Sequence, residues 1–206
     1  MGIFKSLAEL QWDLLKEIGN IGAGHAATAL STLLMKPVDM LVPEVRLVPF
    51  EEISESLGGP EALVVAILLR VEGETPGNLF FLLSMESSKR ILENLVGITP
   101  EEGMAFNEME LSALNEIGNI LAGSYLSSLA DFTNLNMQPT VPALAVDMAG
   151  AILSTGLDKF GEMGDQALFI DTKFLQASEV VEGHFFFIPD PESFERIFAA
   201  LGVEGL

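Results

Sequence analysis

The chain matches itself at an interval of about 100 residues, and this internal repeat constrains its fold more than any other feature. A shift of 99 residues places Glu-Ile-Gly-Asn-Ile at 17–21 on the identical residues at 116–120. Across 8–48 the same shift gives 12 identities in 41 positions without a gap. The interval is too long for a solenoid, whose repeats span about 20–45 residues. We therefore interpret it as a duplicated half-domain.

The repeat continues toward the C-terminus at a changed offset. Residues 77–95 match 183–201 at a shift of 106, so the second copy gains seven residues between the two matching blocks. We expect a single domain over 1–206, composed of two pseudo-repeats at about 1–98 and 107–206. A pseudo-two-fold axis would relate the two copies.

Both copies predict the same succession of elements. Apolar residues at helical spacing predict long helices at 8–34 and 108–133, with capping residues Ser6 and Asn107 at their starts. Short runs of strand character follow, and each copy closes with a second helix. The expected strands are 44–49, 63–71, 78–83, 142–148, 166–174 and 183–188, and the closing helices are 85–96 and 190–201. The fold class is thus α+β, with two α-β-β-β-α halves sharing one mainly antiparallel sheet.

The sequence is strongly acidic and also apolar. It has 30 Asp and Glu against 10 Lys and Arg, a net charge of −20, and 49% hydrophobic residues. Such a surface repels phosphate backbones and anionic lipid, so we expect neither nucleic acid nor membrane as a partner. The absence of cysteine excludes disulfides and Cys-ligated zinc and fits a reducing compartment. Since the first residues also lack a signal-peptide pattern, we expect a cytoplasmic location.

Polar residues recur on one face of each predicted long helix. They stand at positions i, i+4 and i+7, which project from the same side of a helix. They are Asp13, Glu17 and Asn20 in the first copy and Ser112, Glu116 and Asn119 in the second. A single exposed Glu is usually a solvated surface residue. Two copies of Glu-Ile-Gly-Asn, each with a Pro at the same distance, favour a functional site.

The residues between these polar positions are apolar or glycine. Leu14, Leu15, Ile18 and Ile21 are expected to form the buried face of the first helix. Glycine destabilises a helix interior by about 0.5–1 kcal/mol relative to alanine, so its repeated use needs a reason. Either another element of the fold or a docking partner approaches the helix closely there. The glycines are Gly19, Gly22, Gly24, Gly118 and Gly123.

The spacing of these residues resembles the signature Asp/Ser-x3-Glu-x2-Asn-x22-Pro of the CheC/CheX/FliY phosphatases of bacterial and archaeal chemotaxis. Both copies satisfy it in full, with Pro43 and Pro142 as the final residues. We expect these prolines to be structural, each ending a turn before a strand. The length and the two intact motifs are most similar to the CheC branch, because CheX-like members carry one motif and FliY-like members add a C-terminal switch domain. The resemblance covers nearly the whole chain.

This resemblance implies hydrolysis of the aspartyl phosphate of the response regulator CheY. Asn20 and Asn119 would orient the attacking water, since a carboxamide both donates and accepts hydrogen bonds. Glu17 and Glu116 would pair with the active-site Lys of the receiver domain in a charge-assisted contact. The Asp or Ser one turn earlier would support that contact.

The resemblance also sets the expected cofactor and partners. The chain has no P-loop and no basic phosphate cradle, so its substrate has to carry its own cations. We expect no cofactor or metal bound by this chain, and Mg²⁺ bound by CheY-phosphate. Binding to CheD, a receptor-modifying glutamine deamidase, is implied by the resemblance alone.

Two other functions fit the same residues. A non-catalytic adaptor could bind a phosphorylated receiver or CheD through the same helix faces, although it would have little need of a water-orienting amide. A metal hydrolase could use Asp13 and Glu17, because carboxylates can hold Mg²⁺. However, this is an ordinary i,i+4 pair, and only His25 is near it in sequence. His184, within a Phe-rich strand, is expected to be structural.

Overall fold

The computed structural model describes residues 9–100, 103, 105–157, 166–176 and 179–202. Within them the same succession of helices and strands occurs twice along the chain. The first half contains α1 (Glu9–Leu34), β1 (Asp39–Leu41), β2 (Val45–Pro49), α2 (Phe50–Ser56), β3 (Leu63–Gly73), β4 (Gly77–Ser84), α3 (Met85–Arg90) and the π-helical turn η2 (Ile91–Val96). The second half contains α4 (Glu108–Thr133), β5 (Met137–Pro139), β6 (Ala143–Met148), α5 (Ala149–Leu157), β7 (Gln166–Gln176), β8 (Glu179–Pro189) and α6 (Pro191–Ala200).

The eight described strands form one antiparallel sheet in the order β1-β7-β8-β4-β3-β5, with β2 also paired to β7 and β6 to β3. Each half therefore supplies the edge strands of the other half. At the centre, where β4 pairs with β8, Phe80 lies opposite Phe186. These two residues are also equivalent in the repeat. In an antiparallel pair, equivalent residues lie opposite each other in this way when a two-fold axis relates the two strands.

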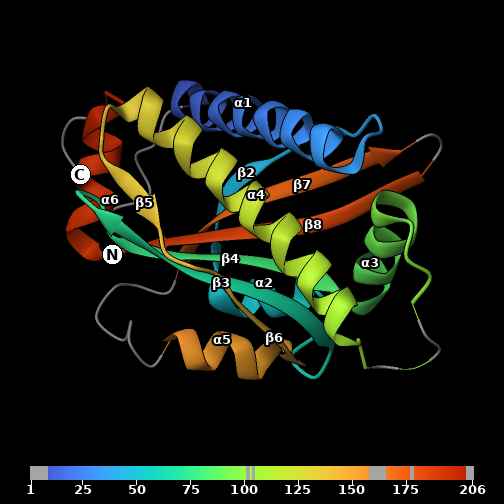
Figure 1. Cartoon of the computed structure of the whole chain (residues 1–206). Coiled ribbons are helices and arrows are strands. Elements are labelled where there is room, and N and C mark those ends of the chain that lie inside the picture. Colours follow the sequence, from blue (N-terminus) through green and yellow to red (C-terminus); the bar gives the residue numbers. More distant parts are fainter. Residues whose placement is uncertain (1–8, 101–102, 104, 158–165, 177–178, 203–206) are drawn as a thin grey trace.

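Helices cover both faces of the sheet (Figure 1). The long helices α1 and α4 lie across one face, and α2 and α5 pack on the other. Two separate groups of buried side chains result, one on each side of the sheet. None of the helices in the described part of the chain is long and apolar enough to cross a membrane.

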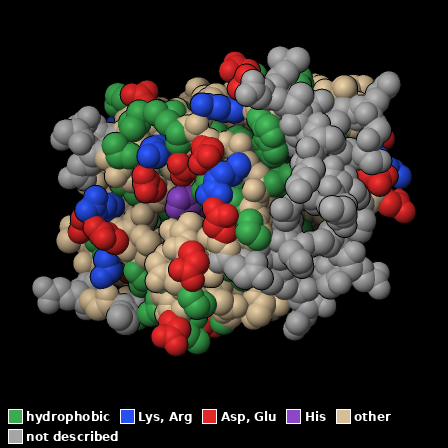
Figure 2. Space-filling model, turned by 180° about the vertical axis from the view of Figure 1, so that it is seen from behind, with side chains coloured by type: hydrophobic (Ala, Val, Ile, Leu, Met, Phe, Trp, Pro, Cys, Tyr) green, Lys and Arg blue, Asp and Glu red, His purple; other side chains and the backbone are tan. Residues whose placement is uncertain are grey.

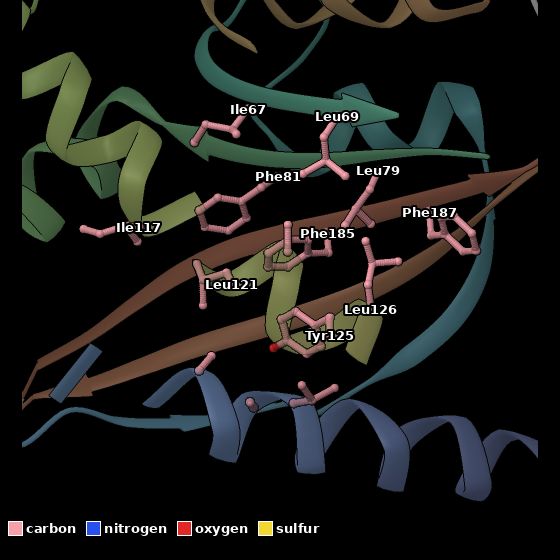
Figure 3. Close-up of a cluster of buried hydrophobic side chains, with 14 of the residues drawn as sticks. Ile67, Leu69, Leu79, Phe81, Ile117, Leu121, Tyr125, Leu126, Phe185 and Phe187 are labelled. Atoms are coloured by element: carbon pink, nitrogen blue, oxygen red, sulfur yellow. The ribbon is translucent and has the colours of Figure 1, made fainter. Parts of the chain in front are cut away.

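Tyr125 of α4 lies at the centre of the larger core, between the long helices and the sheet (Figure 3). Its ring meets that of Phe185 edge-on at 4.7 Å between centroids, and Phe185 stacks on Phe81 at 4.5 Å. Its hydroxyl is hydrogen-bonded to Thr172 Oγ1 at 3.0 Å. Burial raises the pKa of Tyr125 well above its ordinary value, and the hydrogen bond to Thr172 only partly opposes this.

The face of the sheet that α2 and α5 cover also carries charged residues on β7 and β8, beyond those helices. Lys173 pairs with Glu182 at 2.9 Å, and the His184 ring lies 3.2 Å from the Asp171 carboxylate and stacks on Phe169. In Figure 2 acidic and basic side chains lie interspersed on this side of the molecule. His184 is therefore held by neighbouring sheet residues, as a structural histidine would be.

The α+β class and the mainly antiparallel sheet are confirmed. The predicted number of strands is wrong: among the described residues each half has four, not three, because β1 and β5 are only three residues long and give no periodic signal. Helices α2 and α5 were also missed, since a helix of seven to nine residues spans too few turns to show an apolar stripe. The capping box of Asn107 with Glu110 is confirmed, with both hydrogen bonds formed. Ser6 lies outside the described residues.

Candidate functional site

The motif of the first half lies on the outer face of α1. Asp13 and Glu17 are exposed, whereas Asn20, one turn further, is partly buried. On the opposite side of the helix Leu15 and Ile18 are buried against the sheet. The expected polar face is therefore present, with a Glu and an Asn side by side on its surface.

The Asn20 carboxamide is held by the backbone of Val42, in the connection between β1 and β2. Asn20 Oδ1 accepts a hydrogen bond from the Val42 amide at 2.9 Å, and Asn20 Nδ2 donates to the Val42 carbonyl at 3.3 Å. Nδ2 also donates to the Lys16 carbonyl at 3.0 Å. Both N–H groups of the amide are thus occupied, and one lone pair on Oδ1 is left for another partner.

The motif of the second half lies on the outer face of α4, and its side chains are freer. Ser112, Glu116 and Asn119 are all exposed. In the described part of the chain no hydrogen bond joins the Asn119 carboxamide to another residue. Val141, the counterpart of Val42, is 89% exposed instead of buried. The Asn119 amide therefore retains its full capacity to donate and accept hydrogen bonds.

Pro43 and Pro142 occupy equivalent places next to these valines. Pro43 lies between β1 and β2, and Pro142 lies between β5 and β6, directly before the first residue of β6. Both are partly buried. Their fixed φ angle helps to define connections of only three residues.

Two exposed apolar residues belong to the same helix faces, and the sequence did not single them out for this. Ile21 was expected on the buried face of α1, but it is 39% exposed and follows Asn20 directly. On α4, Met109 is 69% exposed and lies two turns before Glu116. In projection along a helix of 3.6 residues per turn, both fall within about 40° of the motif Glu. Each motif thus combines a carboxylate and an amide with an exposed apolar contact.

The carboxylates at these faces do not gather into a metal site. Among the described residues, no group of three or more His, Asp or Glu side chains is arranged to hold a metal ion. His25, the histidine near the first motif, approaches Ser128 of α4 through Nδ1 at 3.4 Å. The arrangement can therefore present a carboxylate and an amide to a partner.

Comparison with a solved structure identifies the class of fold. The structure matches that of FliY from Thermotoga maritima with a TM-score of 0.76, at 18% identity, covering 96% of this chain and 98% of the other. The fold is therefore the one found in this FliY structure.

Comparison of sequences identifies the family. The CheC-like family model matches residues 10–46 and 109–146, which contain both motifs. The chain is 42% identical to the CheY-P phosphatase CheC of Bacillus subtilis over 98% of this chain and 99% of that protein. It is also 30% identical to the flagellar motor switch phosphatase FliY of the same organism, over 85% of this chain and 45% of that protein. The chain belongs to the CheC-like family.

Proposed function

We propose that the chain is a phosphatase that hydrolyses the aspartyl phosphate of CheY. The main support is a 42% identical relative, matched over nearly its whole length, that is named a CheY-P phosphatase. The residue-level proposal is carried by one observation: the exposed Asn119 amide, which no described residue binds, lies one turn beyond an exposed carboxylate on the outer face of α4. The substrate of this reaction is itself a protein, which has to dock on the helix face.

The chemistry required is modest. Phosphoryl transfer depends on in-line positioning and on neutralisation of the developing charge, with little covalent chemistry from the enzyme. The receiver supplies the phosphoaspartate, Mg²⁺ and a Lys, and Asn119 supplies an amide that holds the attacking water. An amide is not basic near neutral pH, so it orients this water without taking its proton. A water-orienting group of this kind contributes a factor of about 10²–10³ in rate.

Glu116 and Glu17 serve as docking anchors in this proposal. Each is exposed on the outer face of its helix, one turn from the Asn, and free to meet the receiver's Lys. Asp13 and Ser112 lie one turn earlier and extend the same contact. The net charge of −20 favours a cation-loaded partner and disfavours a free phosphate ester.

The test is phosphate release from phosphorylated CheY in the presence of Mg²⁺. The wild-type chain is expected to accelerate release above receiver autodephosphorylation, and Asn20→Ala/Asn119→Ala to abolish the acceleration while still binding CheY-phosphate. Asn78→Ala is the matched control, because Asn78 lies on β4 with its side chain on the sheet face away from α1 and α4. No acceleration by the wild-type chain would refute the proposal.

The anchoring role has its own test. Glu17→Gln/Glu116→Gln is expected to weaken CheY-phosphate binding by about tenfold, the equivalent of one lost charge-assisted hydrogen bond. The loss should shrink at high salt, because salt already screens the wild-type contact. The control is Glu55→Gln/Glu93→Gln, two exposed carboxylates outside α1 and α4. Unchanged affinity in the first pair would exclude anchoring by these residues.

A non-catalytic docking role is the second candidate, and one observation favours it at the first motif. The Asn20 amide is already bound to the chain, so this face can bind a receiver through Glu17 with less capacity to hold water. Binding of CheD, implied by the family resemblance, stays a prediction. A pull-down with purified CheD would check it, with the Glu17→Gln/Glu116→Gln variant showing whether the motif faces take part.

A further inference from the structure

The five glycines of the motif helices fall into two groups. For three of them a Cβ would lie closer to another part of the fold than an ordinary van der Waals contact allows. A Cβ on Gly19 would lie 3.2 Å from the Val42 side chain, and one on Gly22 would lie 2.7 Å from the Tyr125 ring. A Cβ on Gly118 would lie 2.8 Å from the side chain of Ile67. Internal packing therefore explains these three residues.

Gly24 and Gly123 have no such explanation. A Cβ built on either residue meets nothing within 4 Å. Both lie well inside helices, α1 and α4, with no left-handed φ angle that would require glycine. In these places alanine would make a more stable helix. Nevertheless both copies of the repeat have glycine at this equivalent position.

Both glycines lie on the motif face. Each follows the Asn of its motif by four residues, which places it one turn further along the same side of the helix. Beyond Gly24 an open groove of about 530 Å³ runs between α1 and β1, and its lining includes Thr28, Ser31 and Asp39. The helix surface one turn beyond the Asn20 amide therefore carries no side chain and opens into a groove.

We propose that Gly24 and Gly123 give a docked receiver domain the clearance it needs to reach the Asn, an inference that rests on the proposed phosphatase function. Asparagine is a short side chain with two rotatable bonds. For its amide to reach a phosphoaspartate, the partner's surface has to touch the helix backbone close by. A side chain one turn away would hold that surface off.

The negative charge next to the glycines also indicates a receiver domain as the docked partner. Exposed carboxylates precede each Asn on the same face, namely Glu17 before Asn20 and Glu116 before Asn119. They complement a receiver active site that carries Mg²⁺ and a Lys. Gly24 and Gly123 are thus specificity-determining contact positions, and they exclude bulky side chains rather than contribute a chemical group.

The experiment compares Gly24→Ala/Gly123→Ala and Gly24→Leu/Gly123→Leu with the wild-type chain. Four quantities are measured: the thermal midpoint, the KM and the kcat of phosphate release, and the Kd for CheY loaded with beryllofluoride and Mg²⁺. The alanine pair is expected to keep or raise the thermal midpoint. The leucine pair is expected to raise KM and Kd by about tenfold or more through a steric clash with the partner, with a smaller change in kcat. Ala29→Leu is the matched control, because Ala29 is exposed on α1 but lies off the motif face.

Each outcome decides the inference. Unchanged KM and Kd in the leucine pair, or an equal rise in Ala29→Leu, would overturn it. A lower thermal midpoint in the alanine pair would show that the glycines serve the fold instead. If the wild-type chain binds the loaded receiver without releasing phosphate, the proposed phosphatase function fails, while the Kd series still judges the clearance. If the wild-type chain does not bind the receiver, both are refuted.

Discussion

The two motif sites have the same residues at the same spacing, yet the structure presents them differently. Both N–H groups of the Asn20 amide donate hydrogen bonds to backbone carbonyls, and its oxygen accepts a hydrogen bond from the Val42 amide. Asn119 is exposed, and no described residue binds its amide. The motif thus fixes which side chains share a helix face, whereas the neighbouring connection decides whether they are free to act.

The difference in structure begins one residue before the equivalent residues Val42 and Val141. In the first half Leu41 is still paired with Lys173 of β7, and Val42 then lies buried against Gly19. In the second half Thr140 is tied to Arg70: its amide donates to the Arg70 carbonyl at 2.8 Å, and its hydroxyl accepts from the Arg70 amide at 3.0 Å. The next residue, Val141, then points outward. Two strand edges with different pairing therefore produce one bound and one free amide.

The largest expected effect concerns the crossing of α1 over α4, where the halves also differ. Gly22 stands where the second half has Leu121, and a Cβ on Gly22 would lie 3.1 Å from the Tyr125 Cα as well as against its ring. Gly22→Leu is therefore expected to lower the free energy of unfolding by about 3 kcal/mol, measured by urea denaturation. Gly24→Leu, two residues further along α1 and in open space, is the control. An unchanged urea midpoint in Gly22→Leu would mean that the helices do not approach each other this closely.

The next effect separates the two sites by activity. Asn119→Ala is expected to lower kcat/KM for CheY-phosphate by about tenfold, because it removes the amide that is free to hold water. Asn20→Ala should lower it by less than about twofold, because most of its hydrogen-bonding capacity is already used. Phosphate-release kinetics of the two single variants provide the measurement. Equal losses would indicate that Asn20 leaves Val42 when the receiver docks.

The same pair of variants should show the opposite order in stability. Asn20→Ala leaves the amide of Val42 without its partner, so we expect the free energy of unfolding to fall by about 1 kcal/mol. Asn119→Ala should change it by less than about 0.5 kcal/mol, since the lost side chain is exposed and forms no hydrogen bond with the described residues. Urea unfolding of both variants checks this. A destabilised Asn119→Ala variant would reveal a structural role for that amide.

The smallest expected effect concerns Tyr125, which stands where the first half has Ala26. Burial holds the pKa of Tyr125 above its value in the unfolded chain, so the folded state keeps its proton at alkaline pH. The unfolded chain loses this proton above about pH 10. The tyrosine's contribution to stability is therefore complete below that pH and declines as the pH rises further.

The test compares Tyr125→Phe with the wild-type chain by unfolding between neutral pH and pH 11. The variant loses the hydrogen bond to Thr172 at every pH, but its stability should fall less steeply above about pH 10. Parallel curves for the two proteins would show that Tyr125 does not contribute to alkaline unfolding.

Long periodic elements could be predicted well from the sequence. The helix expected at 108–133 is α4 as observed, and the strand expected at 78–83 differs from β4 by one residue at each end. The capping residues of α4 and the faces that carry the two motifs also followed from local spacing. Local rules suffice in these cases because many residues repeat the same signal.

Features that depend on contacts between distant segments could not be predicted. The exchange of edge strands joins Val45 to Ile170, and nothing in either segment alone specifies that pairing. The exposure of Ile21 depends on how α1 lies against the sheet, and the bond from Asn20 to Val42 depends on where one loop ends. Of the glycines, only the structure separates those that pack within the fold from those that face outward.

The exchange of edge strands also has a consequence for how the molecule is made. Strand β2 finds its partner in β7, so it has no sheet to join until most of the chain has left the ribosome. During that interval its backbone groups form an open edge, a feature that invites pairing with another chain. Folding dominated by such distant pairings is slow compared with helical bundles of similar size. Neither half can complete its own sheet, and an isolated half could do so only by borrowing strands from a second copy.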